Sequence, residues 1–268
     1  MVQFLYRMTP VIRNYTVLTV FGLIIAWQLL ITLFHPPIYI IPSPISVFEK
    51  LTGQMAPLLK NGAATGQAII IGFGIAVVFG IPTALMIAFS KFFERTLYPI
   101  LVFSQLVPKI ALAPVFIIWF GFGITSKVLI TALLCYFPLV VDSLAGFRAL
   151  EPDIEQLARS MKASRWDFFM KVRLPAALPH IFSGLKVSIT MATVGAVVGE
   201  FIGSDVGLGH LLLQANGDLD TPLLFSTLIV LTAIGLIYYY IVELLEKIAI
   251  PWHVSMRKKV GSAVAGEE

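Results

Sequence analysis

The sequence is poor in charge, because only 13% of its 268 residues are Asp, Glu, Lys or Arg whereas 58% are hydrophobic. Soluble domains carry about a quarter of their residues as charged side chains, since polar groups must cover the outside. This chain has too few of them, and lipid is the simplest solvent for so much apolar surface. The scarcity of charge therefore predicts an integral membrane protein.

Cysteine is nearly absent as well. The single Cys135 excludes an intramolecular disulfide, and no Cys/His spacing indicates a metal site. The histidines are scattered along the chain, and no G-x-S-x-G nucleophile elbow is present, which argues against an intramembrane enzyme. The net charge of +4 forms no continuous basic stripe, so we expect no nucleic-acid partner.

Long apolar stretches recur along the sequence. A helix needs about 20 apolar residues to cross a bilayer, and in lipid its backbone amides must be satisfied internally. The candidate stretches are 17–34, 67–89, 97–120, 128–147, 185–202 and 223–245. We therefore predict an all-α polytopic membrane protein with about six transmembrane helices. The third stretch contains Pro99, Pro108 and Pro114, which predict a broken helix.

The basic residues predict the orientation. If the N-terminus is cytoplasmic, nearly all loop Lys and Arg residues fall on the cytoplasmic side, and only Lys50, Lys60 and Lys127 fall on the other. Lys109 and Lys186 lie within or at the ends of apolar stretches. The pattern predicts that both termini are cytoplasmic.

The connection between the fourth and fifth stretches has an amphipathic pattern. Ile154, Leu157, Ala158 and Met161 recur at helical spacing and predict an apolar stripe on a short helix. Ser164, with Asp167 three residues later, is typical of the start of a second helix.

We expect Leu174-Pro175 to end that second helix. Such a hairpin suits docking into a groove of a partner protein. Lying flat on the membrane surface is the alternative.

The same connection resembles a known signature. Gln156-Leu157-Ala158, then Lys162, then Val172-x-Leu174-Pro175 follow the spacing of the EAA signature of ATP-binding-cassette (ABC) importer permeases. Flanking segments such as residues 117–123 (IIWFGFG) and 175–179 (PAALP) are similar to the nitrate, sulfonate and taurine branch. Two positions depart from the signature: Gln156 replaces its acidic residue, and Lys162 replaces a glycine that permits a tight turn.

The resemblance implies a type I ABC importer permease, with residues 1–268 as one transmembrane domain. Residues 152–175 would form a cytoplasmic coupling hairpin. Its implied ATPase-coupling residues are Ile154, Gln156, Leu157, Ala158, Met161, Lys162, Ala163, Val172, Leu174 and Pro175.

The implied partners are a second copy of the chain, two ATP-binding subunits and an extracytoplasmic substrate-binding protein, in the inner membrane of a bacterium. ATP and Mg would belong to the ATP-binding subunits, because this chain has no G-x-x-x-x-G-K-[ST] loop. No cofactor is expected in the chain itself.

Polar residues inside apolar stretches are candidates for the translocation pathway. We select Gln105, Lys109, Asp142 and Glu200. Lys109 could attract an anion, pair with Asp142 or hold the kink, and Glu200 could act in the pathway or make an interhelix hydrogen bond.

The resemblance favours a small anion such as a sulfonate, taurine or nitrate as cargo. A pyrimidine- or flavin-like vitamin precursor is the alternative within the same class. A secondary transporter or channel without an ATPase is the rival from another class.

Overall fold

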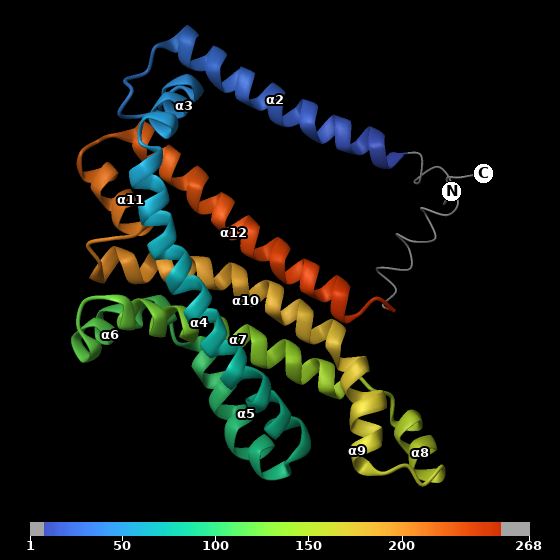
Figure 1. Cartoon of the computed structure of the whole chain (residues 1–268). Helices are drawn as coiled ribbons and strands as arrows, with labels where there is room; N and C mark the ends of the chain where they lie inside the picture. Colours follow the sequence, from blue (N-terminus) through green and yellow to red (C-terminus); the bar gives the residue numbers. More distant parts are fainter. Residues whose placement is uncertain (1–7, 253–268) are drawn as a thin grey trace.

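The computed structural model describes residues 8–252, and every regular element in this range is helical (Figure 1). The all-α prediction is confirmed there. In chain order the elements are α2 (Met8–Phe34), α3 (Pro44–Gly53), α4 (Met55–Phe89), α5 (Lys91–Leu106), η1 (Lys109–Leu112), α6 (Ala113–Phe120), α7 (Ile124–Arg148), α8 (Pro152–Ser160), α9 (Arg165–Phe168), η2 (Phe169–Arg173), α10 (Leu174–Gly203), α11 (Leu208–Gly217) and α12 (Thr221–Ala249).

Four helical segments of the described range are long and apolar enough to cross a membrane: 55–89, 124–148, 165–203 and 221–249. The pair formed by α5 and the segment 109–120 supplies a fifth if it is counted as one bent span. The apolar part of α2, Leu18–Phe34, is shorter. The expected number of about six crossings therefore stays a prediction.

The third apolar stretch turns sharply. Its two helical parts, α5 and the segment 109–120, meet at 90°. Pro99 is accommodated inside α5, and the helix instead ends at Leu106, just before Val107-Pro108. Val107 is extended (φ −73°, ψ 126°), as the residue before a proline prefers to be, so Pro108 is the proline that breaks the stretch.

The centre of the bundle is a close seam between α7 and α10. Small residues of one helix meet the other along its length, so that a Cβ built on Gly195 would lie 2.7 Å from the Cα of Thr131. A Cβ on Gly184 would lie 2.8 Å from the Cβ of Asp142. Glycine lets two helix backbones approach closely, which gives dense packing where lipid supplies no hydrophobic driving force. The seam holds both helices that lead into the α8–α9 hairpin.

The hairpin of α8 and α9 projects beyond the bundle (Figure 1). The N-terminal end of α2 and the C-terminal end of α12 lie toward the same side of that view. This arrangement agrees with the orientation expected from the basic residues, and the cytoplasmic placement of the termini stays a prediction.

The seam yields a stability prediction. We expect Gly195→Ala to lower the free energy of unfolding by about 1–3 kcal/mol, because the added methyl meets backbone atoms that cannot move aside. Thermal unfolding of the full-length chain in detergent measures this change. Gly74→Ala is the control, since no atom lies within 4 Å of a Cβ built there. Equal melting temperatures for the two variants would contradict the prediction.

Candidate functional site

The tip of the hairpin presents bulky apolar side chains to its surroundings. Leu157 and Met161 are 61% and 74% exposed, and Ile154 is also exposed. Gln156 is exposed beside them, whereas Ala158 and Ala163 line a cavity behind the tip. A cluster of exposed apolar side chains on a projecting segment is typical of an interaction site.

The turn at the tip explains one departure from the EAA signature. Lys162 has a φ of +54°, in the left-handed region that favours glycine. The N–H of Ala163 donates to the carbonyl of Ala158 (3.1 Å), as at a helix end capped by a left-handed residue. The backbone thus keeps the turn that a glycine would permit, with a lysine in the strained position.

The start of the second helix agrees with the sequence prediction. The N–H of Asp167 donates to Ser164 Oγ (3.0 Å), so Ser164 caps α9. The Ser164 hydroxyl in turn donates to the Asp167 carboxylate, which also pairs with Lys171 (2.6 Å). The hairpin therefore has a defined second arm.

The predicted end of that arm at Leu174-Pro175 is wrong. A π-helical turn, η2, joins α9 directly to α10, and the N–H of Leu174 donates to the carbonyl of Phe169. Pro175 has no N–H and its ring would clash with the carbonyl of Lys171 in a regular α-helix. The wider π turn accommodates the proline, so the helix continues. Val172, Leu174 and Pro175 consequently lie partly buried at the root of the hairpin.

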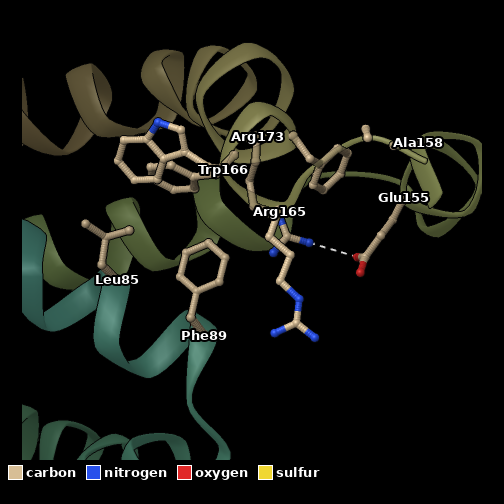
Figure 2. Close-up of a pocket in the computed structure, with 10 residues that line it drawn as sticks. Leu85, Phe89, Glu155, Ala158, Arg165, Trp166 and Arg173 are labelled. Atoms are coloured by element: carbon tan, nitrogen blue, oxygen red, sulfur yellow. Dashed lines mark hydrogen bonds and ion pairs between the residues drawn. The ribbon is translucent and has the colours of Figure 1, made fainter. Parts of the chain in front are cut away.

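A cavity of about 860 Å³ lies between the hairpin and the end of α4 (Figure 2). The Arg173 guanidinium pairs with Glu155 (2.9 Å) in its wall. Its carbon Cζ lies 5.1 Å and 5.4 Å from the ring centroids of Phe89 and Phe168. The sequence did not indicate this cluster, because Phe89 is far from Arg173 along the chain and its helix carries no motif.

The broken third stretch holds two of the pathway candidates. Lys109 begins η1, and its Nζ lies 4.5 Å from the ring centroid of Phe137 on α7. Its suggested ion pair with Asp142 does not form in the structure, since the Lys109 ammonium lies over the aromatic ring instead. Gln105 is exposed near the end of α5. Asp142 is half-buried in the seam, against Gly184.

Glu200 joins three helices at the opposite end of the bundle from the hairpin. Its carboxylate is 1% exposed and accepts from the Thr65 hydroxyl of α4 (2.9 Å) and the Gly209 N–H of α11 (2.8 Å). A Cβ on Gly207, whose φ is +122°, would clash with Glu200 Oε1. Of the two roles considered for Glu200, a pathway residue or an interhelix hydrogen bond, these contacts support the hydrogen bond.

Lys127 was expected in an outer loop, and that expectation is wrong. The residue lies in α7 and is 4% exposed. Its Nζ donates to Ser204 Oγ (2.9 Å) and to the Val206 carbonyl (3.4 Å). Its backbone packs directly on Gly199, where a Cβ would lie 3.0 Å from Lys127 Cα. Lys127 therefore helps to hold the α10–α11 connection.

The turn at Lys162 gives a second prediction. We expect Lys162→Gly to slow hydrogen exchange of the Ala163 amide about fivefold, because glycine removes about 1 kcal/mol of left-handed strain. Exchange measured by mass spectrometry on the full-length chain tests this. Lys162→Ala, which loses the charge but keeps Cβ, should exchange like the native chain. The same exchange rate in the Gly and Ala variants would refute the backbone explanation.

Comparisons with known proteins agree on the class of this chain. Residues 76–249 match the family "Binding-protein-dependent transport system inner membrane component". A probable ABC transporter permease protein of Haemophilus influenzae is 38% identical and covers 82% of this chain and 90% of its own length. The riboflavin transport system permease protein RibX of Chloroflexus aurantiacus is 36% identical, with 88% and 89% covered.

A third relative and a solved structure extend the comparison. The formylaminopyrimidine transport permease protein ThiX of Halalkalibacterium halodurans is 33% identical, with 86% of this chain and 92% of its own length covered. The fold is similar to a chain of the inward-facing MetNI methionine ABC transporter, with a TM-score of 0.63 at 16% identity, covering 73% of this chain and 97% of that one. The chain therefore belongs to the family of inner membrane components of binding-protein-dependent transport systems, as an ABC importer permease and not an enzyme.

Proposed function

We propose that the hairpin of residues 152–175 couples this permease to a separate ATP-binding subunit. The observation that carries the proposal is the projecting hairpin (Figure 1), at whose tip the large apolar side chains of Leu157 and Met161 are mostly exposed. Apolar anchors on a short helix suit a groove in a partner. The other implied coupling residues either flank the tip or brace it at its root.

In this proposal two such subunits bind ATP and Mg. When the two subunits close together, they move the hairpins. Each hairpin passes the motion into α7 and α10, the two helices to which it is joined. Rigid-body motion of helices around a central path is the general basis of alternating access. An extracytoplasmic binding protein delivers the cargo, as the family description implies.

The permease works as a pair of identical chains in this proposal. The surface of α5 and α6 supports it, because Phe103, Leu106 and Ile118 of the broken third stretch are all strongly exposed there. Gln105 and Lys109 lie on the same stretch, and the proposal assigns them to the junction of the two copies and to the pathway. Asp142 and Glu200 were the other two pathway candidates, and their contacts in the α7–α10 seam and with Thr65 and Gly209 favour a role in helix packing instead.

The cargo is a small organic or inorganic anion such as a sulfonate, taurine or nitrate, and Lys109 supplies the attracting charge. Relatives named for aliphatic sulfonates and for taurine are 32% and 31% identical. The higher identities of the riboflavin and formylaminopyrimidine permeases favour a second candidate cargo, a flavin- or pyrimidine-like vitamin precursor.

Coupling is tested by charge at the tip. We expect Leu157→Asp and Met161→Asp to abolish co-purification of the ATP-binding subunit and ATP-driven uptake, because a carboxylate cannot enter an apolar groove without loss of its hydration. Insertion into the membrane should be unchanged.

Leu219→Asp is the matched control, since Leu219 is 62% exposed and lies between α11 and α12, at the other end of the bundle. It should retain the ATP-binding subunit. Normal complex assembly and uptake in both tip variants would remove the hairpin from coupling.

Lys109 separates the two cargo classes. We expect Lys109→Ala to reduce uptake of a sulfonate about tenfold in proteoliposomes with the complete transporter, because a partly buried cation contributes more than 1 kcal/mol to anion binding. Lys60→Ala, at an exposed position, is the control. Unchanged uptake would take Lys109 out of the pathway, and a transporter that moves a neutral heterocycle but no sulfonate would overturn the anion preference.

A further inference from the structure

The cavity behind the hairpin has the size and lining of a ligand site. Its volume of about 860 Å³ falls in the range of small-molecule pockets. Phe89 from α4 and Trp166 and Phe169 from the second arm form an aromatic wall (Figure 2). The exposed anchors of the tip, Leu157 and Met161, are not among the lining residues, whereas Ala158 and Ala163 are, so the cavity lies directly behind the proposed ATPase-docking face.

Two guanidinium groups line the cavity, that of Arg173, which is partly buried, and that of Arg165, which is exposed. Arg173 is held by Glu155, but its Nε is buried and makes no hydrogen bond. Arg165 lines the same cavity, and no hydrogen bond or ion pair joins its side chain to another residue of the described range. An unsatisfied buried donor is costly, and a charged one more so. The buried Nε of Arg173 therefore lacks an acceptor in the cavity, and the exposed Arg165 adds a second positive charge to its lining.

The surroundings indicate which anion. Trp166 is 69% exposed next to Arg165, and Lys171 and Arg173 follow just before the apolar helix α10. Aromatic and basic residues at the end of a membrane helix are typical of the membrane–water interface, and the cytoplasmic leaflet carries anionic lipids. A phospholipid also has the acyl chains that an aromatic wall can pack against.

We propose that this cavity binds an anionic phospholipid of the cytoplasmic leaflet. Its phosphate accepts hydrogen bonds from Arg165 and from the free Nε of Arg173, and its chains lie along Phe89 and Trp166. The lipid thereby fills the space between the hairpin and α4 and stiffens the connection that the proposed coupling uses. The inference uses the cytoplasmic placement of the hairpin from the proposed function, but lipid binding itself requires no ATP-binding subunit.

Native mass spectrometry of the delipidated full-length chain tests the proposal with added phosphatidylglycerol and phosphatidylcholine. We expect phosphatidylglycerol to bind at least about fivefold more tightly, and Arg165→Gln to remove that preference. Lys171→Gln is the matched control, since it removes a charge from the same arm. The native Lys171 pairs with Asp167 and does not line the cavity. The Lys171→Gln variant should keep the preference.

A second variant guards against a change in folding. Arg173→Lys retains the charge but loses Nε, and we expect it to weaken phosphatidylglycerol binding. The melting temperature of Arg165→Gln should match that of the native chain, which shows that its loss of lipid preference does not come from unfolding. Equal binding of the two lipids, or equal effects of Arg165→Gln and Lys171→Gln, would overturn the proposal.

Soluble anions provide the last arm. Glycerol 1-phosphate should compete poorly, because it lacks acyl chains; competition as strong as that of the lipid would assign the cavity to a free anion and overturn the proposal. Co-purification of the ATP-binding subunit with Arg165→Gln is scored separately. Lipid preference and co-purification are measured independently, so a failure of the lipid proposal can be told apart from a failure of the coupling proposal.

Discussion

The close packing of α7 against α10 sets the position of the hairpin and of the buried contacts at the opposite end of the bundle. These two helices enter and leave the hairpin, so their separation decides where both of its arms begin. Near the hairpin, a Cβ on Gly146 would lie 2.9 Å from the Ala177 carbonyl, and at the far end Gly199 lies against Lys127. Glycine at such positions brings backbones together along most of the membrane thickness. The pair therefore behaves as one rigid unit that carries the hairpin.

The two ends of this unit differ in their polarity and their contacts. At the end away from the hairpin, Glu200 and Lys127 are buried and hydrogen-bonded to the α10–α11 connection and its neighbours. Buried charges are costly unless they are fully bonded, so these contacts fix the geometry of that end. At the other end the hairpin stands beyond the bundle, with apolar side chains that no described residue covers. An end anchored by buried polar contacts and a free end suited to a partner are consistent with force entering at the hairpin.

At Lys162, one of the two departures from the family signature, the geometry of the turn is kept and the residue identity is not. Lys162 adopts the left-handed conformation that a glycine would adopt without strain. The π turn before Pro175 keeps the proline of the signature while the helix continues. The backbone of this chain thus fits the spacing of the signature at both positions.

Composition and pattern determined the class of the protein: a chain with so little charge has to be solvated by lipid, and lipid requires helices. Sequence also predicted the apolar stripe, the Ser164 cap and the importer family, because each depends on residues close together along the chain. Only the tertiary structure decided that Pro108 makes the sharp bend while Pro99 does not, that Lys127 is buried, that Lys109 lies over Phe137, and that Phe89, Arg165 and Arg173 share a cavity. Those outcomes depend on which side chains meet across helices, and a one-dimensional pattern contains no information about the rotation and approach of one helix relative to another.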